Sequence, residues 1–228
     1  MYKNRYQRNG RTITPEENTI LAGKKVFIAG AGGLGGYILE FLLRAGVGRI
    51  TIIDPDRFDD TNLNRQILCT EPLMNVSKAE TAANRAAVVN SEVKVTALKE
   101  KLTAENALEL CKGHDILIDA LDNIPARLAM QDAAEKLNIP MVHGAIAGSY
   151  GQVSVVMPGD RTLSKLYMDS KDKGVETELG NPSYTPAIVA GMEVNEALKV
   201  LLNKGTPLVK KVLYIDLLEN EYNTIDIV

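Results

Sequence analysis

A glycine-rich turn between an apolar strand and an apolar helix constrains this 228-residue chain more than any other feature. Residues 26–29 predict a short buried strand, and residues 37–43 have the apolar content of a helix. The turn between them has the G-x-G-x-x-G spacing with one further glycine, and its members are Gly30, Gly32, Gly33 and Gly35. Such a turn brings backbone close to a phosphate or ribose, although glycines also serve helix packing alone. The order of strand, turn and helix favours a nucleotide-binding fold.

An acidic residue, Asp54, follows the next predicted strand at residues 49–53. It lies about 20 residues beyond the glycines, where a dinucleotide fold places the acid that binds ribose hydroxyls. This much fits NAD as well as ATP. The polar run and the helix start that follow add two cations and further polar groups, which suit a triphosphate: Asp56, Asn62, Arg65, Gln66 and Lys78. Taken singly, these residues also fit a solvated loop and an ordinary helix start.

The rest of the chain alternates between predicted helices and strands. Helices are predicted at 77–90, 103–111, 123–138 and 186–202, and strands at 93–98, 115–120, 140–144, 152–157, 211–217 and 222–227. We expect an α/β fold, a Rossmann-like doubly wound and mostly parallel sheet with helices on both faces and antiparallel strands at its C-terminal end. Residues 159–184 are predicted to be one long, charged, irregular segment, which in a compact domain is usually functional or disordered.

Composition excludes several classes of protein. A hydrophobic content of 45% over residues 1–228 is enough for one core, so we expect a single domain. A net charge of −3 and a pI near 5.6 give no basic footprint for nucleic acid. The polar start of the chain does not resemble a signal peptide, and glycines and Glu40 interrupt the apolar run at 26–43. We therefore expect a cytoplasmic protein without a membrane segment.

Six motifs occur in an order that resembles the E1-like activating enzymes. These are RYQR at 5–8, GAGGLGG at 30–36, DPD at 54–56, NLNRQ at 62–66, NVSK at 75–78 and LDNIPAR at 121–127. The family includes the molybdopterin and thiamine sulfur-carrier adenylyltransferases and the adenylation domain of the ubiquitin-activating enzyme. The resemblance implies ATP-dependent adenylation of the C-terminal carboxylate of a small ubiquitin-like sulfur-carrier protein, usually with a Gly-Gly tail, and release of pyrophosphate.

The resemblance also implies roles for individual residues. Asp54 would bind the ribose, and the phosphates would be surrounded by Asn62, Arg65, Gln66 and Lys78. Asp122 would hold a magnesium ion, and Arg8 would reach into the neighbouring subunit of a homodimer. Arg8, Arg65, Lys78 and Asp122 are therefore the expected catalytic residues, and Asp56 and the glycines complete the nucleotide site. Residues 1–22 would form a helical arm, and residues 159–184 a crossover loop that covers the carrier tail as a lid.

The chain departs from its relatives in its cysteines. Many bacterial members have two CxxC pairs that hold structural zinc, and this sequence has neither, so we expect no zinc. Members that form a thioester or persulfide place a cysteine in the loop before the last long helix, and residues 159–184 contain none. We expect Cys69 and Cys111 to be small buried residues. A covalent step is therefore not assigned.

Three other functions remain as alternatives. Within the same family, the acceptor could be a non-protein group such as threonylcarbamoyladenosine tRNA, although the acidic pI counts against RNA. An NAD-dependent oxidoreductase shares the glycines and Asp54 but gives no reason for NLNRQ or Lys78. A catalytically idle dimeric scaffold would be expected to lack the arginine, the lysine or the magnesium aspartate, and all three are present.

Other titratable residues are expected to be structural. Ligands of open α/β sheets bind at the carboxyl ends of strands, where Asp122 is predicted to lie and Asp115 is not. His143 is predicted at the same edge, and we expect it to be a structural histidine with its hydrogen bonds satisfied. His114 precedes its strand and is predicted to face the other edge.

Overall fold

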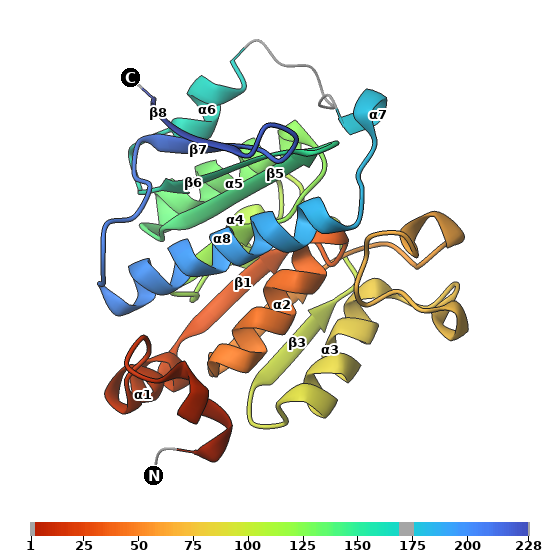
Figure 1. Ribbon diagram of the computed structural model, residues 1–228, viewed down its shortest axis with the longest axis vertical. Coiled ribbons are helices and arrows are strands. Elements are labelled where there is room, and N and C mark those ends of the chain that lie inside the picture. The colour runs from red at the N-terminus through yellow and green to blue at the C-terminus, as the bar shows by residue number, and fades with distance from the viewer. Residues whose placement is uncertain (1–2, 169–175, 228) are drawn as a thin grey trace.

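The structure, a computed structural model, describes residues 3–168 and 176–227. Its centre is one eight-stranded sheet with the order β3-β2-β1-β4-β5-β6-β7-β8 (Figure 1). The first five strands are parallel: β1 (Lys25–Ala29), β2 (Arg49–Ile53), β3 (Lys94–Leu98), β4 (Ile116–Asp119) and β5 (Met141–Ala147). The other three are antiparallel: β6 (Tyr150–Val156), β7 (Lys211–Asp216) and β8 (Glu221–Asp226). The predicted fold class is confirmed.

Helices cover both faces of the sheet. One face carries α2 (Gly33–Ala45), α3 (Lys78–Val89) and α8 (Tyr184–Leu202), with α1 (Pro15–Gly23) against α8. The other face carries α4 (Ala107–Cys111), α5 (Ile124–Leu137) and α6 (Thr162–Leu166). The remaining short elements are α7 (Glu176–Leu179) and the 3-10 helices η1 (Asn4–Asn9), η2 (Asp60–Asn62) and η3 (Glu71–Leu73).

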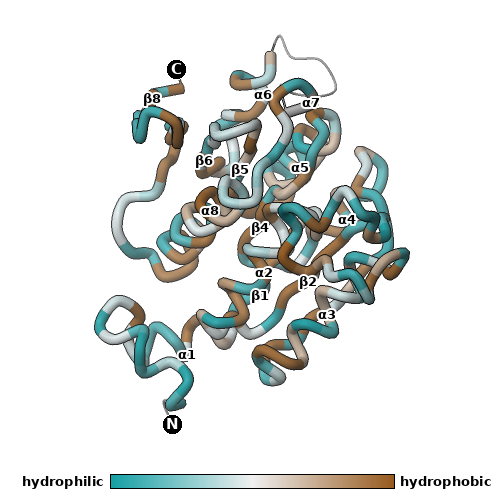
Figure 2. Tube along the Cα trace, turned by 45° about the vertical axis from the view of Figure 1, so that its right-hand side comes forward, coloured by the Kyte–Doolittle hydropathy of each residue, from teal (hydrophilic) through white to brown (hydrophobic). Residues whose placement is uncertain are grey.

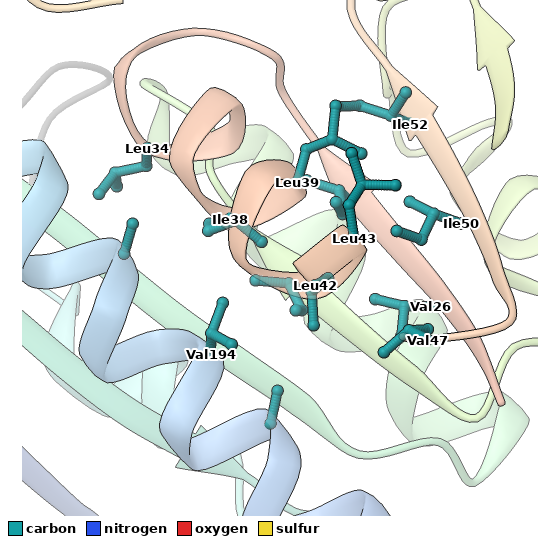
Figure 3. Close-up of a cluster of buried hydrophobic side chains, with 14 of the residues drawn as sticks. Val26, Leu34, Ile38, Leu39, Leu42, Leu43, Val47, Ile50, Ile52 and Val194 are labelled. Atoms are coloured by element: carbon teal, nitrogen blue, oxygen red, sulfur yellow. The ribbon is translucent and has the colours of Figure 1, made fainter. Parts of the chain in front are cut away.

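Each face has its own apolar core. On the α2 face, Leu42 lies toward Val194 of α8, while Leu43 lies toward Ile50 of β2 (Figure 3). The opposite core is built around Phe27 and other apolar residues packed between the sheet and α5. Apolar residues accordingly concentrate along the central strands, and polar residues predominate in the N-terminal segment (Figure 2). This double coverage explains why β1 and β4 read as continuous apolar runs.

Strand β8 differs from the others because all six of its residues are exposed. It pairs with β7 along its whole length and forms the last strand of the sheet. Tyr222 is 50% exposed and Ile225 is 53% exposed. No helix among the described residues is long and apolar enough to cross a membrane.

Two sequence-based assignments were wrong. The helix expected at 103–111 begins only at Ala107, because the side chain of Asn106 accepts a hydrogen bond from the Thr103 N–H at 2.8 Å and holds the preceding residues in turns. The segment expected to be irregular at 159–184 contains α6 and α7. Helix α6 forms because Leu163 is fully buried in the α5-side core, an anchor that the surrounding charges hide in the sequence. Residues 169–175 of that segment lie outside the described residues.

Candidate functional site at the carboxyl edge of the sheet

The glycine turn lies between β1 and α2, packed against the residues that follow β4. Gly30 has φ +103°, and a Cβ there would lie 2.5 Å from the Ala120 carbonyl oxygen. A Cβ at Gly35 would lie 1.9 Å from the Gly30 carbonyl oxygen. These two glycines are therefore required by close backbone packing. Gly32 caps α2, whose first N–H groups have no intrahelical partner and can bind an anion.

Asp54 closes this turn onto the end of β2. Its carboxylate accepts hydrogen bonds from the N–H groups of Ala31 at 2.7 Å and Asp56 at 2.8 Å. The side chain is buried, and burial raises the pKa of Asp54 above its ordinary value, against the opposing effects of the two N–H groups and Lys78. Asp54 thus shapes the turn, and its ribose contact stays a prediction.

Lys78 is the first residue of α3 and is only 7% exposed. Its ammonium lies 3.3 Å from the carboxylate of Asp56, whose side chain is 65% exposed. This distance is longer than the roughly 2.7–2.9 Å typical of a charge-assisted hydrogen bond. A buried ammonium held this loosely by an exposed carboxylate is well placed to pair with an incoming anion.

The segment around η2 brings further donors to the glycines. The Gln66 side-chain nitrogen lies 3.7 Å, and the Arg65 side chain 3.8 Å, from where Cβ atoms on Gly32 and Gly33 would sit. Arg65 Nη1 donates to the carbonyl of Thr61 and to Asn64, both at 2.9 Å, and a guanidinium group has five N–H donors in all. The Gln66 side-chain oxygen is buried without a hydrogen-bond partner.

We call Asp54, Asp56, Arg65, Gln66 and Lys78, together with the glycine turn, the glycine-turn cluster. Asn62 is buried beside it. Its side-chain amide accepts a hydrogen bond from the Asp59 N–H and donates one to the Asp59 carboxylate, both at 3.3 Å. The visible role of Asn62 is therefore to shape the loop that carries Arg65 and Gln66, and its predicted contact with phosphate stays a prediction.

Asp122 occupies the turn between β4 and α5, beside the glycine turn. It is exposed, and its carboxylate accepts a bond of 3.4 Å from the side chain of Asn123. The side chain of Asn123 in turn caps α5 by accepting the Ala126 N–H at 3.0 Å. Within residues 3–168 and 176–227 no group of three or more His, Cys, Asp or Glu side chains could hold a metal ion.

Arg8 lies far from this edge. Its 3-10 helix η1 is anchored to the loops that enter β2 and β3: Arg5 bonds the side chain of Asn90, and the Tyr6 ring contacts the backbone at Gly46. Those loops are at the amino ends of the strands, whereas the glycine turn is at the carboxyl ends. Strands of five residues separate the two edges by about 16 Å, at about 3.3 Å a residue. Arg8 is therefore not near the glycine turn of its own chain.

A second set of polar residues follows the strands next to the glycine turn. We call it the buried network, and its members are Asp119, Arg127, His143, Gln152 and Tyr167. Asp119 accepts a hydrogen bond of 2.7 Å from His143 Nδ1, so His143 Nε2 is the acceptor for the Tyr167 hydroxyl at 3.0 Å. The Tyr167 oxygen accepts from Gln152 at 2.7 Å and from Arg127 at 3.0 Å. Burial lowers the pKa of His143 and raises that of Tyr167 to about 12, so both groups are neutral. The expectation that the hydrogen bonds of His143 are satisfied is confirmed, and its structural role stays a prediction.

Sequence reasoning missed most of this network and also missed Glu193. Glu193 is fully buried between α8 and β5, where a Cβ on Gly144 would lie 2.2 Å from its carboxyl carbon. Neither carboxylate oxygen has a hydrogen-bond partner, and burial raises its pKa well above the ordinary value. A signal was available, since Glu193 lies three residues after Ala190 and four before Ala197 on the buried stripe of α8.

The cysteines and the second histidine lie in protected surroundings. Cys69 and Cys111 are both buried, as expected, and burial raises the pKa of Cys111 to about 12 and also raises that of Cys69. His114 is at the amino edge, where its ring bonds the carbonyl of Cys111 at 3.0 Å and the hydroxyl of Thr51 at 2.9 Å.

Comparison with known proteins agrees with the motifs and the fold. Residues 6–227 match the ThiF family. A sulfur carrier protein adenylyltransferase from Thermus thermophilus is 37% identical over 224 residues, which are 94% of this chain and 83% of that protein. A SAMP-activating enzyme E1 from Haloferax volcanii is 30% identical over 216 residues, covering 93% and 80% of the two chains.

Solved structures share the architecture. The crystal structure of E. coli MccB with ATP superposes with a TM-score of 0.84 at 21% identity, over 99% of this chain and 71% of that one, and shows the fold alone. The E. coli tRNA N6-threonylcarbamoyladenosine dehydratase TcdA gives a TM-score of 0.74 at 26% identity, over 87% and 94% of the two chains. Because the ThiF match spans nearly the whole chain, this protein belongs to the ThiF family of E1-like activating enzymes.

Proposed function

We propose that this protein uses ATP to adenylate the C-terminal carboxylate of a small ubiquitin-like sulfur-carrier protein, with release of pyrophosphate. The enzyme is an adenylyltransferase of the ThiF family. One observation supports the role of the glycine-turn cluster most strongly: Lys78 is buried beside the turn, and its ammonium is held loosely, 3.3 Å from the exposed carboxylate of Asp56. A triphosphate would give this ammonium a closer partner of higher charge.

The chemistry asks the protein for position and charge rather than for an acid or base. A carboxylate is already a nucleophile at neutral pH, so it must be held in line with the α-phosphorus of ATP. Lys78, Arg65 and the N-terminal N–H groups of α2 would neutralise the phosphates, with Gln66 and Asn62 completing the contacts. Asp54 would bind the ribose from its place at the end of β2.

Magnesium is the metal that this site would take, with Asp122 as its protein ligand. Mg²⁺ in nucleotide sites is usually held by one or two carboxylates together with substrate phosphates, so a single exposed carboxylate beside the glycine turn fits it. When bound, the ion would supply further neutralisation of phosphate charge. We retain the expectation that the protein has no zinc.

A homodimer would bring Arg8 to the site that its own chain keeps it from reaching. Arg8 is exposed on η1 at the amino edge of the sheet. In an isologous dimer the arm of each subunit, residues 1–22, would deliver Arg8 to the partner's phosphates, as an arginine finger does. The chain would then be one adenylation domain over residues 1–228, with residues 159–184 as the crossover loop over the Gly-Gly tail.

A different acceptor is the second candidate. The similarity to TcdA, a dehydratase for threonylcarbamoyladenosine in tRNA, favours a non-protein acceptor, whereas the pI near 5.6 counts against RNA. The first experiment is ATP–pyrophosphate exchange with candidate carrier proteins and, separately, with modified tRNA. We expect exchange with a carrier that ends in Gly-Gly and none with the same carrier lacking those residues. Pyrophosphate exchange with modified tRNA and with no carrier protein would identify RNA as the acceptor. Calorimetry that detects binding of NAD but no binding of ATP would contradict adenylation altogether.

The shared site is tested by mixing two inactive variants. Arg8→Ala and Asp122→Ala homodimers should each be nearly inactive while remaining folded. After subunit exchange, activity should return to about a quarter of the wild-type value, because half of randomly mixed dimers are heterodimers with one intact site of two. Arg11→Ala, an exposed arginine just beyond η1, serves as the control and should retain activity. No recovery, with heterodimers confirmed by mass spectrometry, would remove Arg8 from the partner's site.

A further inference from the structure

The turn that carries Asp122 is held on one side by hydrogen bonds from its own backbone N–H groups. The Ala120 N–H donates to the carbonyl of Ala29 at 2.9 Å, and the Leu121 N–H donates to the carboxylate of Asp119 at 2.9 Å. Asp122 itself is exposed and contributes only the long contact with Asn123 among its described hydrogen bonds. The direction in which Asp122 projects therefore depends on what holds the backbone beside it.

Arg127 supplies that hold from α5. Its Nη2 donates to the carbonyl of Leu121 at 2.6 Å, one residue before Asp122. Its Nη1 donates to the Tyr167 hydroxyl at 3.0 Å, and its Nε lies 3.6 Å from the Asp119 carboxylate. The residue is 8% exposed, and its guanidinium carbon lies 5.5 Å from the centre of the Tyr167 ring. One planar group thus joins the turn, the end of β4 and the end of α6.

Tyr167 fixes the other side of Arg127. Its oxygen is an acceptor for two donors, Arg127 and Gln152, and it donates to His143, which is oriented by Asp119. Every member of this chain of bonds is buried or half-buried, so the arrangement has little freedom to change one partner at a time. The guanidinium plane is therefore set by groups on three separate elements.

We propose that Arg127, oriented by Tyr167, is a positioning residue that aims Asp122 at the metal. This inference rests on the proposed function, because it assigns the buried network to the same nucleotide site. Arg127 does not touch substrate; it acts by fixing the Leu121 carbonyl and hence the backbone from which Asp122 projects. Lysine could not replace it, since a single ammonium cannot bond Leu121 and Tyr167 in the fork geometry of a guanidinium group.

The test uses Arg127→Lys and Tyr167→Phe in the full chain, with Arg161→Met as the matched control. Arg161 also binds α5, through Asp132 at 2.9 Å and Glu135 at 2.6 Å, but does not contact the Asp122 turn. We expect both test variants to raise the Mg²⁺ concentration for half-maximal pyrophosphate exchange, roughly tenfold or more for Arg127→Lys and roughly fivefold for Tyr167→Phe. ATP affinity measured in EDTA should be unchanged in all three variants.

A second readout needs neither ATP nor acceptor. Hydrogen-exchange mass spectrometry of the ligand-free protein should show faster exchange over residues 117–124 in the two test variants and not in Arg161→Met. Faster hydrogen exchange together with a wild-type magnesium requirement for pyrophosphate exchange would mean that Arg127 is only a structural residue. That result would overturn the proposal. Unchanged hydrogen exchange would also overturn it, even where the proposed function has failed because no acceptor supports pyrophosphate exchange. Should Arg127→Lys fail to fold, Tyr167→Phe carries both measurements.

Discussion

Two polar assemblies lie at the same edge of the sheet and use their hydrogen-bonding groups differently. In the buried network, His143 donates a hydrogen bond to Asp119 at 2.7 Å and accepts one from Tyr167 at 3.0 Å. In the glycine-turn cluster, the Lys78 ammonium pairs loosely with Asp56, and the Gln66 oxygen has no hydrogen-bond partner. The hydrogen bonds of Asp119, His143 and Tyr167 form without a ligand, whereas the glycine-turn cluster has capacity that the protein does not fill.

This difference separates structural from ligand-binding polarity in one molecule. Buried polar groups are costly unless they are paired, so a complete network stabilises the fold and specifies its geometry. Loosely paired groups beside a backbone turn gain most when an anion arrives. Substitutions in the buried network should therefore lower the free energy of unfolding, in addition to any effect on the Asp122 turn, whereas substitutions in the glycine-turn cluster should lower activity and leave stability nearly unchanged.

The largest effect is expected for Asp119→Ala. Removing this fully buried carboxylate takes away its 3.6 Å ion pair with Arg127 and the hydrogen bond that it accepts from His143. We expect the free energy of unfolding to fall by about 3–5 kcal/mol in urea denaturation. Asp115→Ala is the control, because Asp115 is at the amino edge, partly exposed, and should lose no more than about 1 kcal/mol. Equal losses for the two variants would break the comparison.

Lys78→Met should show the opposite pattern. Exchange of pyrophosphate should fall by at least about 100-fold, because a preorganised positive charge on the phosphates is lost. The free energy of unfolding should change by less than about 1 kcal/mol, since Asp56 is exposed and the buried carboxylate of Asp54 keeps its hydrogen bonds from the Ala31 and Asp56 N–H groups. Lys101→Met, at an exposed lysine, checks for general charge effects. A large loss of stability in Lys78→Met would mean that Lys78, like the buried network, stabilises the fold.

Glu193→Gln sharpens the comparison, because Glu193 belongs to neither assembly. Its carboxylate is buried, and neither oxygen has a hydrogen-bond partner. The folded pKa is raised, so above the ordinary value of 4.5 the unfolded chain releases a proton that the folded chain retains. Wild-type stability should consequently fall as pH rises above that value, by up to about 1.4 kcal/mol per pH unit from this group. The glutamine variant lacks this term, so its stability relative to wild type should increase between about pH 5 and about pH 8.

Denaturation of both proteins at the two pH values measures the change. Glu196→Gln is the control on the same helix, since Glu196 accepts the Leu208 N–H at 2.8 Å and pairs with Lys199. That variant should be less stable than wild type at about pH 8. A pH-independent difference between Glu193→Gln and wild type would mean that Glu193 is ionised in the folded protein.

The smallest effects are expected at the cysteines, which neither assembly uses. Cys69→Ala and Cys111→Ala should retain adenylate formation, because burial raises the pKa of both thiols and leaves little thiolate for attack. Stability should fall by roughly 1 kcal/mol from the small cavities left behind. Radioactive or mass-spectrometric detection of the acyl adenylate provides the measurement. Its absence in a folded variant would show that a thiol takes part before or during adenylation.

The glycine-turn cluster was predictable because its parts are local and their spacing is informative. Gly30 and Gly35 are required by contacts that the G-x-G-x-x-G pattern encodes, and Lys78 and Asp54 lie at element ends that apolar runs locate. The buried network was not predictable in this way. Tyr167 and Arg127 are 40 residues apart and meet only because α6 packs beside α5.

Short elements also escaped the sequence analysis for a physical reason. Helix α6 has five residues, too few to show a helical period, and its position depends on burial of Leu163 rather than on local propensity. The edge of the sheet at which Asp122 lies was correctly predicted, because it follows from parallel strand order. The hydrogen bond from Arg127 to the Leu121 carbonyl, in the turn that carries Asp122, could not be predicted. It depends on the direction of a side chain in the folded protein.

Strand β8 has a practical consequence for handling the protein. Its outer edge pairs with no other strand among the described residues and offers free backbone N–H and C=O groups beside exposed Tyr222 and Ile225. Such an edge is a template for intermolecular strand pairing, which charged residues discourage. Glu221 and Asp226 place a negative charge at each end of the strand. Neutral substitutions at Glu221 and Asp226 would therefore weaken the barrier to aggregation at this edge, well away from the nucleotide site.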